Sequence, residues 1–228
     1  MDLVDYSSLL ELMKARRSIR RLKSDPVPTE DVKKILEAAR WAPSGANTQP
    51  WEFIVVDDED VKNKLLDAVE GTIDTDLLRK APVLIVVCGD TRVKILYPGG
   101  RHLDYIDKIK DREQQTEITD DILNSSLSNT FLYMLLAATS LGLGTRYITS
   151  TRRQPAHLKI KELLNMPSYL VIYDTIALGY PVSEPRAKTM KPFEEVVHYN
   201  QFDETKGRTD DDILVEVERV IKRFGLKR

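Results

Sequence analysis

Lys14-Ala15-Arg16-Arg17-Ser18-Ile19-Arg20-Arg21-Leu22-Lys23 places six cationic side chains and one hydroxyl group within ten residues. The whole chain carries 34 Lys and Arg against 36 Asp and Glu, so this stretch is a local excess of positive charge. Such an excess predicts an anionic ligand. The stretch also follows an expected helix, and cations in a last helical turn can simply complement the negative end of the helix dipole. Both interpretations stay open from this stretch alone.

A second polar stretch, Ala42-Pro43-Ser44-Gly45-Ala46-Asn47-Thr48-Gln49-Pro50-Trp51, lies further along the chain. Its two prolines and its glycine keep the backbone out of regular structure. Its Ser, Asn, Thr and Gln side chains are neutral hydrogen-bonding groups. A ligand with a phosphate at one end and a heteroaromatic ring at the other would use both stretches.

Three groups of residues resemble motifs of the nitroreductase-like flavoprotein family. The first is Arg-Arg-Ser-Ile-Arg at 16–20, followed by Pro26-Val27-Pro28, and the second is Ala-Pro-Ser-Gly-x-Asn-x-Gln-Pro-Trp at 42–51. The third is Leu178-Gly179-Tyr180-Pro181, followed by Glu184-Pro185-Arg186-x-Lys188 and by Pro192-Phe193-Glu194-Glu195-Val196-Val197. Their order is that of the family, and together they cover most of the chain, with residues 91–119 outside the resemblance.

The resemblance implies an α+β fold, with a mainly antiparallel sheet flanked by helices and a C-terminal arm exchanged across a homodimer. It also implies FMN as the cofactor, bound where the two subunits meet. The first motif would then supply contacts to the phosphate and the ribityl chain from Arg16, Arg17, Ser18 and Arg20. The second motif would approach the isoalloxazine ring from the other subunit through Pro43, Ser44, Gly45 and Asn47.

Two further groups of cofactor residues follow from the same resemblance. After the central helix the family runs a short segment beside the reactive ring nitrogen N5, here Ile148, Thr149 and Ser150. Thr149 would be the catalytic residue, donating to N5 through its N–H or its hydroxyl. Near the C-terminus, Arg186, Lys188 and Lys191 would lie close to the phosphate. Met190 departs from the family's pattern, in which many members carry a cation at this position.

Composition predicts an ordinary globular protein, with 42% hydrophobic and 31% charged residues in a chain of 228. We expect a single domain over 1–228. The formal net charge of -2 gives no reason to expect nucleic acid or a membrane as a partner.

The N-terminus has no pattern of a secretory signal, so the expected compartment is the cytoplasm. The lone cysteine, Cys88, lies in an apolar run and is expected to be a buried core residue.

Hydrophobic periodicity and turn residues predict both helices and strands. We expect residues 91–119, which are polar and contain Pro98-Gly99-Gly100, to form a lid that selects the substrate. Residues 182–228 are expected to form an arm and a final helix. The expected helices are 7–15, 29–42, 60–69, 76–80, 122–141, 155–164 and 210–224, and the expected strands are 52–57, 83–88, 145–148 and 169–178.

The sequence offers little for catalysis without a cofactor. The three histidines, His102, His157 and His198, are isolated and show no metal-ligand spacing, so no metal is expected. Ser44-Gly45 lacks the Gly-x-Ser-x-Gly pattern of a hydrolase nucleophile. A basic cluster with a neutral polar loop and no evident nucleophile suits a protein whose cofactor does the chemistry.

The function expected from the resemblance is that of an FMN-dependent oxidoreductase. It would use NADH or NADPH to reduce a small aromatic acceptor by a ping-pong mechanism. One alternative is a specialised relative, either a reductive dehalogenase or an enzyme that consumes its own flavin. Another is a flavin-binding sensor without turnover.

Overall fold

The computed structural model describes residues 4–92, 116–185 and 187–224. Most of the expected lid and one expected cofactor residue, Arg186, lie outside the described residues. The last residues of the expected lid, 116–119, form the start of a helix. The chain divides into two compact units, Met1–Pro185 and Arg186–Arg228, which are described separately below.

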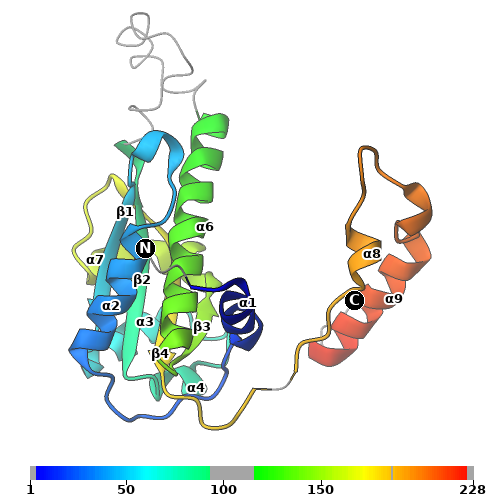
Figure 1. The fold of residues 1–228 in the computed structure, drawn as a ribbon. Coiled ribbons are helices and arrows are strands. Elements are labelled where there is room, and N and C mark those ends of the chain that lie inside the picture. The colour runs from blue at the N-terminus through cyan, green and yellow to red at the C-terminus, as the bar shows by residue number, and fades with distance from the viewer. Residues whose placement is uncertain (1–3, 93–115, 186, 225–228) are drawn as a thin grey trace, which may run out of the picture. The chain divides into compact units, whose positions relative to one another are not determined.

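The first unit alternates helices with four strands (Figure 1). Most expected elements are confirmed with shifts of a few residues at their ends, and the central helix begins earlier than expected, at Thr116. The elements are α1 (Tyr6–Ala15), α2 (Thr29–Arg40), η1 (Gly45–Asn47), β1 (Trp51–Val56), α3 (Glu59–Asp67), α4 (Thr75–Arg79), β2 (Val83–Asp90), α6 (Thr116–Ser140), β3 (Gly144–Ile148), η3 (Thr149–Arg152), α7 (Ala156–Leu163) and β4 (Leu170–Gly179).

The strands form one sheet in the order β1-β2-β4-β3, and every pair is antiparallel. This confirms the expected α+β class with an antiparallel sheet. Seven of the eight residues of β2 are buried, as its uniformly apolar sequence predicts for a central strand. Cys88 lies in this strand and is fully buried, and burial raises the pKa of its thiol to about 12. Its expected role as a core residue is confirmed.

Each face of the sheet carries its own hydrophobic core. On one face, α2 and α6 pack against the sheet through residues such as Ile35, Phe131 and Met134. On the other face, α3, α4 and α7 contribute Leu65, Leu78 and Ile160. The sheet is therefore the middle of three layers, and α6 is the long helix of one outer layer.

Glycines allow two close approaches that matter for the site. A Cβ atom on Gly89 of β2 would lie 2.7 Å from Cδ1 of Leu127, so α6 can sit directly on the sheet at this point. A Cβ atom on Gly144 of β3 would lie 2.8 Å from Cγ1 of Ile19. Only glycine therefore leaves room for the segment that carries the basic cluster to lie on β3.

The basic segment is fixed to the edge of the sheet by its backbone. Ser18 forms a parallel bridge with Thr145, and the N–H of Ile19 donates to the carbonyl of Thr145 at 2.8 Å. Further along, the N–H of Lys23 donates to the carbonyl of Tyr180 at 2.8 Å. The backbone of the basic segment is thus held beside β3.

The second unit contains α8 (Phe193–Val196), η4 (Glu204–Lys206) and α9 (Asp210–Phe224). The expected final helix is confirmed with the same bounds. His198 and Phe202 stack with their ring centroids 4.3 Å apart, and the ring nitrogen Nδ1 of His198 accepts a hydrogen bond from the N–H of Asp203. These contacts fold the segment between α8 and α9 onto itself.

Asp174 is a buried carboxyl group on β4, with only 3% of its surface exposed. Its Oδ1 atom has no hydrogen-bond partner within the described part of the chain, and Nε of Arg152 lies 3.8 Å from it. Burial raises the pKa of Asp174 to about 6, although the positive charge of Arg152 opposes the rise. A carboxyl group in this position is stable in its protonated form at mildly acidic pH.

The free energy of unfolding should therefore depend on pH through Asp174. Between its usual pKa of 3.8 and about 6, the folded protein binds more protons than the unfolded chain. Stability should consequently fall as pH rises through this window, by up to roughly 3 kcal/mol. Asp174→Asn mimics the protonated form and should remove this component, whereas Asp25→Asn at an exposed site should not. Urea denaturation from pH 4 to pH 8 measures the effect, and parallel curves for wild type and Asp174→Asn would contradict it.

Candidate cofactor site

The start of the basic cluster lies beside β3. Arg16 ends α1 and is half-buried, and Ser18 lies against Thr145. Burial raises the pKa of the Tyr147 hydroxyl to about 12, with smaller contributions in the same direction from Tyr173 and Asp174, and Arg16 is close enough to oppose the rise. The structure thus brings the first expected group of cofactor residues to the edge strand that leads directly to Thr149.

Arg17 has contacts of its own within the chain. Its Nη1 atom donates to the carbonyl of Lys14 and, at 2.9 Å, to the carbonyl of Arg16. These carbonyls belong to the last turn of α1, where the helix leaves its acceptors unsatisfied. Arg17 therefore does complement the C-terminal end of α1, as one of the two interpretations of the sequence expects. A role of Arg17 in binding a ligand has to be tested separately from this role in the helix.

The second polar stretch lies against the first half of α6. The N–H of Gly45 donates to Oγ of Ser126 at 3.3 Å, and Nδ2 of Asn129 donates to the carbonyl of Pro43 at 3.1 Å. Oγ of Ser44 accepts from the N–H of Gln49 at 3.0 Å, which closes the loop on itself. A hollow of about 280 Å³ lies here, lined by Pro43, Ser44, Gly45, Ile122, Ser125, Ser126 and Asn129.

Two residues of this loop adopt the left-handed backbone region. Ala46 has a φ of 50° and Asn47 a φ of 55°. A positive φ suits Asn but costs free energy at Ala, so the surrounding contacts must hold the loop in this shape. The side chain of Asn47 is exposed, which leaves its amide available to a ligand.

Within one chain, the basic cluster and the polar loop do not meet. The loop follows α2, the cluster follows α1, and Figure 1 shows α1 and α2 on opposite sides of α6. A single ligand that used both stretches would need one of them from another copy of the chain. The separation of the two stretches within one chain therefore decides how a ligand could contact both of them.

Ile148, Thr149 and Ser150 lie where β3 passes into η3. Ile148 is fully buried, and Thr149 is exposed. Ser150 is buried to 6% exposure, and its Oγ has no hydrogen-bond partner among the described residues. A buried hydroxyl without a partner costs free energy, so it indicates a group that is completed by a ligand or by another chain.

The C-terminal cations fall in the second unit. Lys188 and Lys191 are exposed there, as is Met190. Their role at a phosphate stays a prediction.

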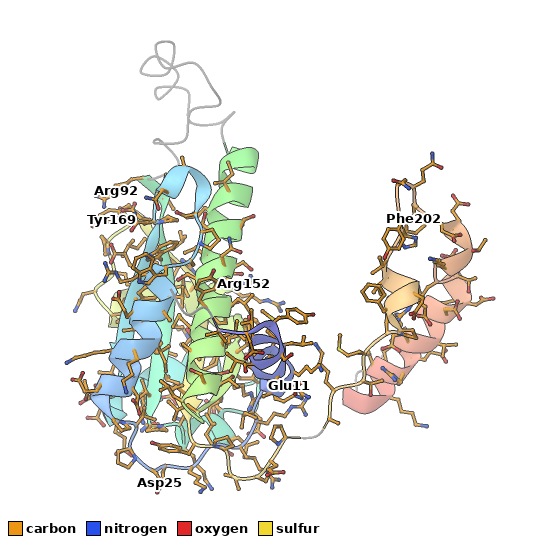
Figure 2. The ribbon with its side chains drawn as sticks, viewed as in Figure 1. Glu11, Asp25, Arg92, Arg152, Tyr169 and Phe202 are labelled. Atoms are coloured by element: carbon orange, nitrogen blue, oxygen red, sulfur yellow. The ribbon has the colours of Figure 1, made fainter. Side chains whose placement is uncertain are left out.

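Sequence reasoning missed three charged residues on or beside β3 and β4. Arg146 lies on β3 between Thr145 and Tyr147, and Nη1 of this arginine is buried without a partner among the described residues. Arg152, labelled in Figure 2, ends η3 and faces Asp174. Their position in the sequence could have identified them, because each lies inside or shortly after an expected strand. Charged residues at such positions are rarely buried without a partner.

At the other end of β2, Arg92 forms an ion pair with Asp90 at 2.6 Å and lies 3.6 Å from the ring centroid of Tyr169 (Figure 2). This contact fixes the end of β2.

Across the described ranges, no three His, Cys, Asp or Glu side chains are placed to hold a metal ion. No helix in these ranges combines the length and the apolar character needed to cross a membrane.

The chain is similar to several known proteins. An NADH dehydrogenase of Thermus thermophilus is 31% identical over 198 residues, covering 80% of this chain and 91% of the relative. An iodotyrosine deiodinase of Thermotoga neapolitana is 29% identical over 194 residues, covering 85% and 98%. The structure of an FMN-dependent nitroreductase of Clostridium difficile matches with a TM-score of 0.66 and 30% identity, covering 85% of this chain and 99% of the other.

The structure of the NADPH:FMN oxidoreductase of Vibrio harveyi has a TM-score of 0.71 at 24% identity, which shows the shared fold alone. The model of the nitroreductase family matches residues 13–180, which contain the basic cluster, the polar loop, the whole sheet and η3. The chain therefore belongs to the nitroreductase family.

Proposed function

We propose that this protein is an FMN-dependent oxidoreductase that takes hydride from NADH or NADPH and reduces a small aromatic acceptor. The observation that carries the proposal is the pair of polar stretches on either side of α6, one cationic and one neutral, in a member of the nitroreductase family. Both nitroreductases and iodotyrosine deiodinases occur among its relatives and structural neighbours, and both names refer to small substrates.

The residues present fit FMN. A phosphate suits the guanidinium groups beside β3, because Arg forms strong paired hydrogen bonds with phosphate oxygens. The unpaired Oγ of Ser150 and the exposed Thr149 offer donors and acceptors at the end of β3. When bound, FMN supplies the hydride chemistry at its N5 atom. The role we assign to Thr149 is to donate a hydrogen bond at that atom.

A ping-pong order is part of the proposal. The described residues include no glycine-rich strand-turn-helix motif for a separate dinucleotide, and Gly142 with its φ of 72° serves instead to end α6. The nicotinamide and the acceptor would then use the same face of the ring in turn. The residues around the hollow at Pro43 would limit the size of both.

The same proposal includes a homodimer, because the polar loop needs a second copy to reach the ring beside β3. Residues 182–228 would reach across to the partner as an arm, and residues 91–119 would select the acceptor. Residues 1–228 would then form a single FMN-binding domain, which includes the lid at 91–119 and the arm at 182–228.

A reductive dehalogenase is the second candidate, favoured by the deiodinase relative that the chain matches over 98% of that relative's length. The two candidates share the cofactor and differ in the acceptor. Steady-state rates with a nitroaromatic compound and with an iodinated phenol, compared at equal flavin content, separate them. A sensor without turnover would bind FMN and fail in both assays.

The first test is the visible spectrum of the purified protein during anaerobic addition of NADH or NADPH. We expect a yellow protein that releases FMN, rather than FAD, on denaturation, because the site offers arginines for one terminal phosphate. The flavin band should bleach with one equivalent of nucleotide and return when a nitroaromatic acceptor is added. A colourless protein that cannot be reconstituted with FMN would refute the proposed function.

The second test concerns Arg17. Hydrogen bonds between charged groups are commonly worth about 1.5–3 kcal/mol, so Arg17→Ala should weaken FMN binding by roughly ten- to a hundredfold. The control is Lys14→Ala in the same helical turn, whose ammonium group pairs with Glu11 at 2.9 Å on the exposed surface. Fluorescence titration of the apoproteins with FMN measures both. If Arg17→Ala lowers the melting temperature of the apoprotein but leaves FMN affinity unchanged, Arg17 serves only the end of α1.

A further inference from the structure

Asp174 is the one charged residue of strand β4, and the pairing of the strands places it on the face of the sheet that α6 covers. Its cross-strand partner is Val87, which belongs to the core beneath α6. The pairing of β4 with β2 skips Tyr173, and Tyr173 packs against the same core. A bulge of this kind re-aims a side chain. Tyr173 and Asp174 therefore lie on the same face although they are neighbours in the sequence.

This face of the sheet carries part of the candidate cofactor site. Tyr147 of β3 pairs with Ile176, which also belongs to the core beneath α6. Burial has the largest effect on the pKa of the Tyr147 hydroxyl, and the charges of Asp174 and Arg16 act on it in opposite directions. The carboxyl group of Asp174 thus shares its surroundings with an arginine of the basic segment.

Arg152 is the cation that acts directly on Asp174. Its Nε atom lies 3.8 Å from Oδ1 of Asp174, which has no hydrogen-bond partner among the described residues. The other titratable groups near this carboxyl group are the hydroxyls of Tyr147 and Tyr173. Helix α6 carries no charged residue from position 123 to position 140. The charge of Asp174 is therefore balanced from η3.

The contact with Asp174 ties η3 to β4 at the end of the turn. Thr149 begins η3 and Arg152 ends it. A further tie is the hydrogen bond that Oγ1 of Thr175 donates to Oγ1 of Thr151 at 3.1 Å. Thr149 is the residue to which we assign the hydrogen bond with the flavin ring. Its position consequently depends on how the other end of the same short turn is held.

The ionised form of Asp174 is unfavourable for the fold itself. Burial disfavours the carboxylate, and Arg152 offsets only part of this cost. Replacing a buried ion pair by well-packed neutral groups is often neutral or stabilising. Charged groups in such costly positions are concentrated at functional sites, where stability is lost in exchange for function.

We propose that Asp174 is a positioning residue of the cofactor site, whose carboxylate holds the guanidinium of Arg152 and thereby keeps η3 and Thr149 in the conformation that binds the flavin ring. The inference rests on the proposed function. The competing explanation is that Arg152 only compensates a buried charge. In that case a neutral residue at position 174 would stabilise the protein without changing the binding of flavin.

The test uses the apoproteins of wild type, Asp174→Asn, Arg152→Gln and the double variant, with the exposed Asp25→Asn as the control. Each is titrated with riboflavin from pH 5 to pH 8. Riboflavin is chosen because it lacks the phosphate of FMN, which itself takes up a proton at a pH of about 6. Stability in urea and hydrogen exchange of the amides of residues 149–152 are measured on the same apoproteins.

At pH 8 both single variants and the double variant should bind riboflavin roughly fivefold more weakly than wild type, because each lacks the same charged contact. The affinity of wild type should fall by the same factor as the pH falls through about 6, since Asp174 takes up its proton there. The affinity of Asp174→Asn should not change in this window, and Asp25→Asn should follow wild type.

The Asp174→Asn apoprotein should be more stable than wild type at pH 8, yet its η3 amides should exchange faster. A variant that merely folds poorly would lose stability together with affinity. Equal riboflavin affinity of Asp174→Asn and wild type at pH 8, or a pH profile that persists in Asp174→Asn, would overturn the proposal and leave the proposed function intact.

Failure of the wild-type apoprotein to bind either riboflavin or FMN would instead refute the proposed function. The exchange of the η3 amides then decides the role of Asp174 by itself. Faster exchange in Asp174→Asn and in Arg152→Gln, with wild-type rates in Asp25→Asn, would support the assignment. Unchanged exchange in Asp174→Asn would overturn it.

Discussion

The burial of α6 between α2 and the sheet is the constraint on which the rest of this structure depends. Phe131 and Met134 fill the core beneath the helix, and Gly89 lets Leu127 approach β2 directly. The buried hydroxyl of Thr130 donates to the carbonyl of Ala39 at 2.6 Å, which ties α6 to the end of α2. The position of α6 fixes both the polar loop after α2 and strand β3 after α6. The two parts of the candidate site are therefore positioned by the same helix.

The same constraint separates the two halves. Ser126 and Asn129 hold the polar loop on one part of α6, while Gly142 ends the helix and sends β3 along the basic segment. Phe131 and Tyr147, whose ring centroids are 4.2 Å apart, fix β3 against α6. Since neither the loop nor the strand can move far without breaking buried contacts, a ligand that needs both has to use two copies of the chain. This packing within one chain is the reason why we propose a site shared between two copies.

Much of the fold could be predicted because local patterns and tertiary packing agree. The apolar run in β2 predicts a central strand, and apolar residues on several faces of 122–141 predict a buried helix. The site was predictable only where polar residues cluster in sequence, as at 16–20 and 43–47. Arg146 and Asp174 could not be found in this way, because each is the one charged residue within its strand. The burial of their polar atoms follows from the pairing of β3 with β4 and from packing on the sheet. For Arg17 the sequence predicts a position but not a role, because an arginine that binds phosphate and an arginine that caps a helix look the same in the sequence.

The measurement that tests this account most directly is the FMN content of mixed dimers. Subunits carrying Arg17→Ala, with a damaged phosphate end, are co-expressed with differently tagged subunits carrying Ser44→Tyr, which fills the loop side, and the heterodimer is isolated through both tags. If each site takes its phosphate end from one subunit and its loop from the other, one site carries both lesions and the other carries none. The account predicts one FMN per dimer, bound with wild-type affinity. Two equally weakened sites, or the absence of any dimer, would contradict it.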